Sequence, residues 1–403
     1  MIFLTKLKIN KAFLSAYLAA FTILPSNCQH KILSTENVVL PGAFQMDEIK
    51  SLLDGKRIGL FANHSALINQ THLLDTLLSL NINVVKIFGP EHGFRGQAAD
   101  GAKISDEVDE KTGIPIISLY GSRRRLSKGD LADIDVLVFD MQDVGTRFYT
   151  YSVDMHFAMQ TVAESNKKFV LLDRPNPHGD EVDGPVLDTA FRSGIGQNRI
   201  PVLHGLTLGE MAQMINGEGW LKDGIQCDLS IVKAKNYDHR MPYSLPIRPS
   251  PNLPNDHAVS WYPTLALFEG TWISVARGTD FPFQAIGCPD STFGNFSFTP
   301  RSIEGISTNP PHLGITCYGI DLRNITPPKG LDLQYLLRFY YIVEDKESFF
   351  RSYFNLLAGT DVLMQQIKAG MSEDEIKETW KPDLDQYKKI RAKYLLYPDH
   401  SNE

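Results

Sequence analysis

Cysteine is scarce in this sequence. The 403 residues include only four cysteines, and no two of them form a CxxC pair. Beyond Cys28, the three that remain (Cys227, Cys288 and Cys317) are odd in number and far apart. We therefore do not expect a disulfide framework to hold the fold, and no cysteine stands beside a histidine as a nucleophile would.

An excess of basic charge is also missing. The chain has 40 Lys and Arg against 47 Asp and Glu, a formal net charge of -7, and its one basic cluster spans only residues 123–125. Nucleic-acid binding domains usually carry a basic patch or stripe. The sequence therefore predicts no nucleic-acid partner.

Several familiar motifs are absent. There is no GxSxG, HExxH or GxxxxGK[ST] pattern, and Gly194-Ile195-Gly196 lies in a long loop instead of following a strand. These absences remove the usual support for a serine hydrolase, a zincin, a P-loop NTPase or a dinucleotide cofactor. The candidate metal ligands, His64, His92 and Asp140 or Asp173, do not have the close spacing of a metal-binding motif, so we predict neither a metal nor a cofactor. A metal-dependent hydrolase stays open as an alternative.

Only the first residues contain a long hydrophobic run. Three lysines precede the apolar segment 12–24, which ends at Pro25-Ser26-Asn27-Cys28. This layout predicts a signal peptide over 1–28 and an exported protein, periplasmic or on the outer surface. Acylation of Cys28 would make it a lipoprotein anchored to a membrane, although Asn27 departs from the small residue expected there; simple cleavage nearby is the alternative.

Five short apolar runs indicate the fold. They cover residues 57–63, 84–89, 114–121, 135–140 and 169–173, and helix-length segments such as 71–80 and 152–166 lie between them. Runs that are apolar on both faces are typical of parallel strands covered by helices. The sequence predicts a doubly wound α/β domain over 40–200, then a second, smaller domain over 201–403 whose end is largely helical. Thr207 and Glu210 have the spacing of a capping box at the start of a helix.

Polar residues follow nearly every predicted strand. In open parallel sheets, ligands bind beyond the carboxyl ends of the strands. We therefore expect an active site at the edge to which the strands deliver Asn63, His64, Glu91, His92, Tyr120, Asp140, Gln142, Asp143, Asp173, Arg174 and Asn176.

Glu91 is the first catalytic candidate. It lies on a glycine-flanked turn near Phe88, Pro90 and Phe94, and desolvation there would raise its pKa and suit a general acid. The alternative for Glu91 is a structural ion pair with Arg95. His92, in the same turn, is also explained as a residue that only packs on the edge of the sheet.

Other residues fit a sugar site. Asp140, Asp143, Arg147 and Tyr149 offer carboxylates for hydroxyl groups and an aromatic face, although Asp143 would equally cap a helix. Glu269 and Arg277, near the aromatic residues 272, 281 and 283, supply a second carboxylate from the other domain. A glycosidase needs two such acids, whereas a sugar-binding lipoprotein needs the same cleft without an acid of raised pKa.

The sequence also resembles a known family. GLFANHSAL, FGPEHGFRG, GIPIISLYG, DVLVFDMQDVGTRFYTY, LLDRPNP, DGPVLD and LFEGTWISVARGT occur in the order found in bacterial exo-β-N-acetylmuramidases of peptidoglycan recycling, long catalogued as a domain of unknown function. The resemblance runs from about residue 55 to the end of the chain. It implies a Rossmann-like domain joined to a smaller α/β auxiliary domain that completes the cleft, and release of N-acetylmuramic acid from the non-reducing end of peptidoglycan fragments.

The resemblance also bears on the site. It implies that Glu91 is catalytic. We take Glu269 as the second catalytic group, with Asp140 and Asp173 as the next candidates for that role. A planar guanidinium would bind the lactyl carboxylate of the sugar, and the loop 177–199 is a candidate for the wall that closes the far side of the terminal ring. The predicted substrate contacts are Asn63, His64, His92, Arg95, Asp143, Arg147, Tyr149, Asp173, Arg174, Asn176 and Arg277.

Overall fold

The computed structural model describes residues 38–90, 94, 107–119, 123 and 125–399. From Val38 onward the chain forms one compact unit. The predicted signal peptide, and with it Cys28, lies outside the described residues, as do Glu91, His92, Arg95 and Tyr120.

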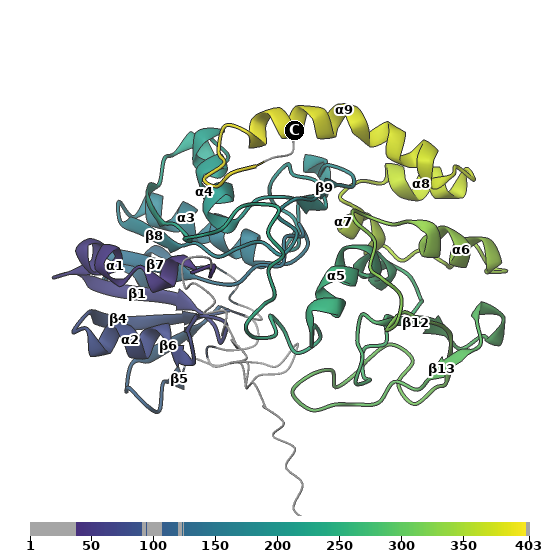
Figure 1. The fold of residues 1–403 in the computed structure, drawn as a ribbon, viewed down its shortest axis with the longest axis horizontal. Helices are drawn as coiled ribbons and strands as arrows, with labels where there is room; N and C mark the ends of the chain where they lie inside the picture. Colours follow the sequence, from purple (N-terminus) through teal and green to yellow (C-terminus); the bar gives the residue numbers. More distant parts are fainter. Residues whose placement is uncertain (1–37, 91–93, 95–106, 120–122, 124, 400–403) are drawn as a thin grey trace, which may run out of the picture. The chain divides into compact units, whose positions relative to one another are not determined.

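A seven-stranded sheet is the centre of the fold (Figure 1). Its order is β11 (Asp228–Val232), β8 (Lys168–Leu172), β7 (Val136–Asp140), β1 (Arg57–Ala62), β4 (Asn83–Gly89), β6 (Pro115–Ser118) and β5 (Glu107–Val108). The first six run parallel and β5 pairs antiparallel with β6. This confirms the predicted α/β class, and the five predicted strands all exist.

Helices cover both faces of this sheet. Two successive residues of β1 show that the sheet has a core on each face. Leu60 packs into a core with α1 (Met46–Leu53) and α2 (Leu73–Ser79), whereas Phe61 packs into the core that contains α3 (Tyr151–Glu164) and α4 (Leu208–Gly217). Because side chains alternate across a strand, a run that is apolar throughout requires such double cover. The capping box at Thr207 and Glu210 is confirmed at the start of α4.

The second half of the chain adds helices and a small sheet. Strands β12 (Ala285–Cys288), β14 (Cys317–Asp321) and β13 (Phe296–Phe298) pair antiparallel in that order. The helices are α5 (Asp256–Leu265), α6 (Gln334–Ile342), α7 (Phe354–Ala358), α8 (Val362–Lys368) and α9 (Glu373–Arg391), and two short pairs, β2 (Leu67–Ile68) with β3 (Thr71–His72) and β9 (Val182–Asp183) with β10 (Leu203–His204), complete the elements.

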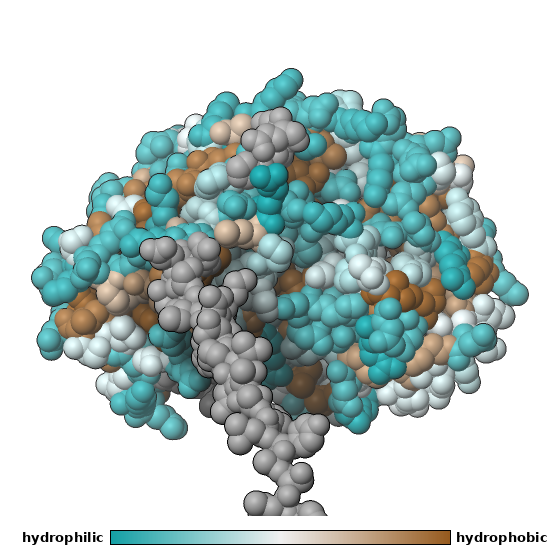
Figure 2. Space-filling view, viewed as in Figure 1, coloured by the Kyte–Doolittle hydropathy of each residue, from teal (hydrophilic) through white to brown (hydrophobic). Residues whose placement is uncertain are grey.

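One apolar core joins the two halves. The cluster that holds α3 and α4 continues through Trp261 of α5, Phe339 of α6 and Phe354 of α7. The face seen in Figure 2 is by contrast mainly hydrophilic. Strand β11 belongs to the central sheet although it lies beyond residue 200, where we placed the domain boundary.

No helix among the described residues is both long and apolar enough to cross a membrane.

Candidate functional site

The carboxyl ends of β1, β4 and β7 lie side by side. Ala62 pairs with Asp140 on one flank of β1, and Phe61 pairs with Phe88 on the other. Pro90, the last described residue before Glu91, is buried directly after β4. Three of the predicted polar segments therefore leave the sheet at the same edge.

Asp140 and Arg174 bind each other at this edge. The guanidinium of Arg174 donates from Nε to Oδ1 of Asp140 (2.5 Å) and from Nη2 to Oδ2 (2.8 Å), and the two side chains are 2% and 0% exposed. Arg174 Nη2 also donates to the carbonyl of Leu67. This bidentate pair ties β7 to the segment after β8, and its burial argues against the catalytic and substrate-binding roles that we predicted for the two residues.

Asp173 is likewise committed to structure. Its Oδ2 accepts from the hydroxyls of Thr207 (2.7 Å) and Tyr397 (2.6 Å), and its Oδ1 accepts from the amide of Gly209 (2.8 Å). Burial raises the pKa of Asp173 to about 6. The carboxyl group holds the start of α4 and the C-terminal segment, with no side left for a sugar.

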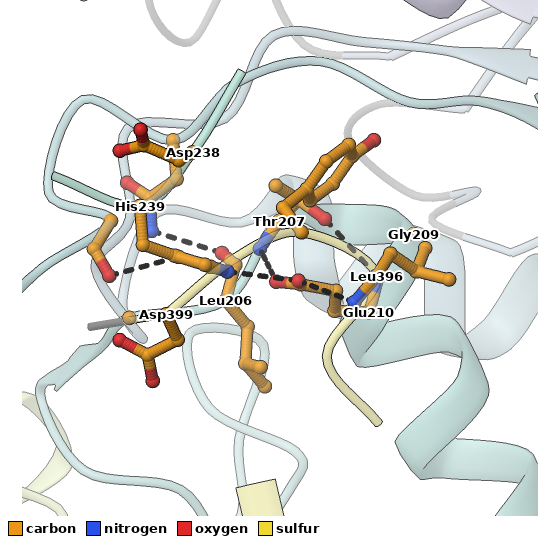
Figure 3. Close-up of polar contacts among 12 residues, drawn as sticks. Leu206, Thr207, Gly209, Glu210, Asp238, His239, Leu396 and Asp399 are labelled. Atoms are coloured by element: carbon orange, nitrogen blue, oxygen red, sulfur yellow. Dashed lines mark hydrogen bonds and ion pairs between the residues drawn. The ribbon is translucent and has the colours of Figure 1, made fainter. Parts of the chain in front are cut away.

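A third buried carboxylate, that of Glu210, lies next to this cluster (Figure 3). Glu210 Oε1 lies 2.9 Å from Nε2 of His239 and accepts from the amide of Leu396, while Oε2 accepts from the amide of Thr207. Both side chains are fully buried. The contact with Thr207 is half of the capping box predicted from the sequence, whereas those with His239 and Leu396, which fix the last described segment of the chain against α4, have no local signal in the sequence.

Arg147 and Asn176 are also structural. The guanidinium of Arg147 donates to four backbone carbonyls, those of Pro185, Ile200, Leu357 and Ala358, at 2.7 to 3.0 Å. Asn176 donates to the carbonyl of Leu206 and accepts from the amide of His178. Both side chains are buried, so the substrate contacts predicted for them have no geometric support.

A small inner cavity of about 110 Å³ lies beside these strand ends. Tyr149 donates through its hydroxyl to the carbonyl of Pro249 (2.9 Å), and Asn63 donates from Nδ2 to the hydroxyl of Tyr151 (2.7 Å). The rings of Tyr149 and Tyr262 meet edge to face at 6.0 Å. The cavity thus has aromatic walls with polar edges; its lining is Phe148, Tyr149, Thr150, Tyr151, Ser250, Asn252, Leu253, Tyr262, Arg277 and Phe283.

Glu269 and Arg277 meet at this cavity. Arg277 lines it and donates from Nε to Oε1 of Glu269 across 2.6 Å. The two side chains are 24% and 23% exposed, so water and ligands reach them. The backbone of Ala276 and Gly278 has positive φ (61° and 79°) on either side of Arg277, and the guanidinium lies 5.0 Å from the ring of Phe283. Of the four arginines predicted to contact substrate, Arg277 is a described one that lines this cavity.

Asp143 is a buried acid close to these tyrosines. Its Oδ1 accepts from the amide of Gly145 (2.6 Å), which makes a turn and not the helix cap that we considered, because α3 begins at Tyr151. Its Oδ2 has no hydrogen-bond partner among the described residues. Burial raises the pKa of Asp143 to about 7, so a large fraction is protonated at neutral pH.

His64 projects from the same edge. Its Nε2 lies 2.9 Å from the carbonyl oxygen of Arg248, and the residue is partly exposed. Within the described residues, no group of three or more His, Cys, Asp or Glu side chains could hold a metal ion. The ligands named for a metal site thus have other contacts: His64 with a carbonyl, Asp140 with Arg174, and Asp173 with hydroxyls.

Several cavity residues were absent from our prediction. Tyr151, Ser250, Asn252 and Tyr262 line the inner cavity although none of them was among the predicted site residues. The proline-rich segment 246–256 was a usable signal, because an extended stretch that supplies Ser250 and Asn252 suits the wall of a site.

Comparison with known proteins identifies relatives over nearly the whole described unit. A family described as "Exo-beta-N-acetylmuramidase NamZ, N-terminal" matches residues 58–257, and its C-terminal counterpart matches residues 260–397. The peptidoglycan beta-N-acetylmuramidase NamZ of Bacillus subtilis (strain 168) is 36% identical over 375 residues, which cover 87% of this chain and 89% of that protein.

Two solved structures are similar as well. One DUF1343 family protein of Bacteroides fragilis NCTC 9343 is 46% identical, with a TM-score of 0.84 over 90% of this chain and 100% of that one. Another from the same organism is 28% identical, with a TM-score of 0.78 over 89% and 99%. The two matched halves meet between residues 257 and 260, so the boundary predicted at residue 200 falls inside the first.

Proposed function

Because the chain belongs to the exo-β-N-acetylmuramidase NamZ family, we propose that it is a glycoside hydrolase that releases N-acetylmuramic acid from the non-reducing end of peptidoglycan fragments. The observation that carries this proposal is the family match across residues 58–397, which contains the sequence motif Gly89-Pro90-Glu91-His92 that begins at the last residue of β4.

The proposed chemistry is acid-assisted cleavage with Glu91 as the acid and base. Glycosidases of this kind protonate the leaving oxygen while positive charge develops on the sugar ring. Support for Glu91 comes from its position in the sequence directly after Pro90, which is buried at the carboxyl end of β4, beside the ends of two other strands that carry polar groups.

The second group is Glu269 in this proposal. The other two candidates for this role are buried and have their own partners. Asp140 accepts hydrogen bonds from Arg174, and Asp173 accepts from Thr207 and Tyr397. Glu269 remains partly exposed and is held by Arg277, which lines the inner cavity. A fixed carboxylate next to the ring would stabilise the positive charge of the transition state, whether as nucleophile, as base, or by orienting the 2-acetamido group.

Arg277 is the proposed contact for the lactyl carboxylate. The guanidinium groups of Arg147 and Arg174 are occupied by four carbonyls and by Asp140. Arg277 uses Nε for Glu269 and borders the inner cavity. A site that buries this guanidinium against a substrate carboxylate would reject N-acetylglucosamine, because that sugar would leave the charge unpaired.

We also propose export of the protein through its N-terminal 28 residues, with Cys28 as a lipid anchor. The support is the pattern of lysines, apolar residues and Cys28 in the sequence. Metabolic labelling with radioactive palmitate tests this directly: the proposal expects label in the wild-type chain and none in Cys28→Ser, and an unlabelled wild-type chain would contradict it.

The test of the activity is incubation of purified protein with the disaccharide of N-acetylmuramic acid linked to N-acetylglucosamine. We expect free N-acetylmuramic acid by mass spectrometry, with equal release in the presence of a chelator. Binding of the disaccharide without any release would instead support a sugar-binding lipoprotein, and loss of release with the chelator would support a metal-dependent hydrolase.

A further inference from the structure

One face of α3 is left open along the whole helix. Most α3 side chains are buried in the core, but Asp154, Phe157, Gln160 and Glu164 are only partly buried. Their spacing of three or four residues places them in one stripe. Since a helix rises about 1.5 Å per residue, the stripe with Thr150 at its start extends roughly 20 Å.

Two further cavities lie along this stripe. The outer cavity, of about 470 Å³, is bordered by Thr150, Asp154 and Phe157, and the end cavity, of about 420 Å³, by Phe157, Gln160 and Glu164. Thr150 also lines the inner cavity. The three cavities therefore form a row that begins at the proposed sugar site and follows α3 away from it.

A stacked pair separates the outer cavity from the end cavity. The guanidinium carbon of Arg125 lies 3.5 Å from the centre of the Phe157 ring, and both residues border both cavities. The opposite wall of the outer cavity includes Ile195 and Tyr353. The loop 177–199 thus borders the outer cavity through residues 193–195, so we no longer propose it as the wall that closes the inner one.

The charges along the row change with distance from the inner cavity. Asp154 and Arg125 border the outer cavity with one charge of each sign, whereas the end cavity has three basic residues, Arg125, Arg192 and Lys222, against the one carboxylate of Glu164. Carboxylates accept hydrogen bonds from sugar hydroxyls, and guanidinium groups bind carboxylates. A glycan in which neutral N-acetylglucosamine alternates with carboxylate-bearing N-acetylmuramic acid matches this order.

We propose that the outer and end cavities bind the saccharide chain on the reducing-end side of the bond that is cleaved. This inference rests on the proposed function. The outer cavity takes N-acetylglucosamine, and the end cavity takes the next N-acetylmuramic acid, whose lactyl carboxylate faces Arg125 and Arg192. The small aromatic inner cavity is then the closed end, and the row along α3 is the open end through which the rest of the glycan leaves.

The test compares two substrates that differ in length. A disaccharide reaches only the outer cavity, whereas a tetrasaccharide with the same terminal N-acetylmuramic acid also fills the end cavity. We expect wild-type kcat/KM to be about tenfold higher on the tetrasaccharide, and Arg192→Gln and Lys222→Gln to remove most of this advantage, since these residues line the end cavity and not the outer one, and a charge-assisted contact contributes about that factor. Tyr341→Ala, at an exposed aromatic residue of α6 outside these cavities, is the matched control and keeps the wild-type ratio.

Each outcome has one meaning. Equal ratios of tetrasaccharide to disaccharide activity in wild type and in both variants would overturn the inference. It would also be overturned if the variants lost activity only on a disaccharide that carries a peptide stem, because the row of cavities would then bind peptide. A wild-type enzyme that cleaves neither substrate would contradict the proposed function itself. Circular dichroism of each variant separates lost contacts from lost folding.

Discussion

Arg277 holds the carboxylate of Glu269 from Nε across 2.6 Å at the border of the inner cavity. This relationship makes the two residues separable by kinetics. Arg277→Lys keeps a charge near Glu269 but loses the planar fork that would grip a lactyl carboxylate. We expect KM to rise at least tenfold with a smaller change in kcat.

Glu269→Gln should act in the opposite sense. It keeps the size and a hydrogen-bond acceptor for Arg277 but removes the negative charge next to the reacting ring, so we expect kcat to fall about 100-fold or more with KM little changed. Steady-state kinetics on the disaccharide measures both. If Glu269→Gln kept wild-type kcat, the second catalytic group would have to be sought elsewhere.

Glu91→Gln tests the acid role. Loss of a positioned general acid typically costs about 10²- to 10⁴-fold in rate, so we expect turnover to drop in that range. The thermal unfolding midpoint should stay within a few degrees of wild type, because glutamine keeps the size of the side chain. An aryl glycoside of N-acetylmuramic acid, whose leaving group needs little protonation, should restore much of the rate; no recovery would argue against proton donation by Glu91.

The Asp140–Arg174 pair should matter for stability. Arg174→Met leaves the buried Asp140 carboxylate without its partner, which typically costs about 3 to 5 kcal/mol of the free energy of unfolding. The exposed pair of Arg57 and Asp135 is the matched control, because water screens it and Arg57→Met should change stability little. Urea unfolding of both variants gives the comparison; equal small losses would show that the buried pair adds no more than the surface pair.

Asp143 predicts an unusual dependence of stability on pH. Burial raises its pKa to about 7, above the ordinary value of 3.8, so between these values the folded chain holds a proton that the unfolded chain releases. Raising the pH through this window therefore favours unfolding, by up to about 1.4 kcal/mol per pH unit. His204, whose Nε2 lies 3.9 Å from Oδ1 of Asp143, contributes with the opposite sign, because burial lowers its pKa to about 3.

The variant Asp143→Asn isolates the effect of the acid. Its free energy of unfolding relative to wild type should increase steadily from about pH 4 to about pH 7 and then level off, as measured by urea unfolding at several pH values. A difference that does not change with pH would contradict the proposed protonation of Asp143.

The sequence determined the sheet more clearly than the site. Runs such as Val136–Asp140 are apolar on both faces, and only a double-covered parallel strand satisfies that pattern. The spacing of Thr207 and Glu210 also predicted a local contact that the structure confirms, because a capping box joins residues three apart. By comparison, Asp228–Val232 has the same length but is only partly buried, and it was missed.

The roles of the polar residues depended on partners far along the chain. Asp173 is satisfied by Tyr397, 224 residues later, and Arg147 by the carbonyls of Leu357 and Ala358. No spacing in the sequence indicates such contacts, so buried structural acids and arginines looked like members of a sugar site. Tyr149 and Arg277 do line the inner cavity, and Asn63 contacts Tyr151 at its wall, because those residues lie where the chain leaves a strand or bends sharply.

The most direct test of the central claim uses two disaccharides of opposite order. The account predicts that the purified protein releases N-acetylmuramic acid when that sugar is at the non-reducing end, and leaves the disaccharide with N-acetylglucosamine at that end intact. Release from the second disaccharide, or no release from the first by folded protein, would contradict it.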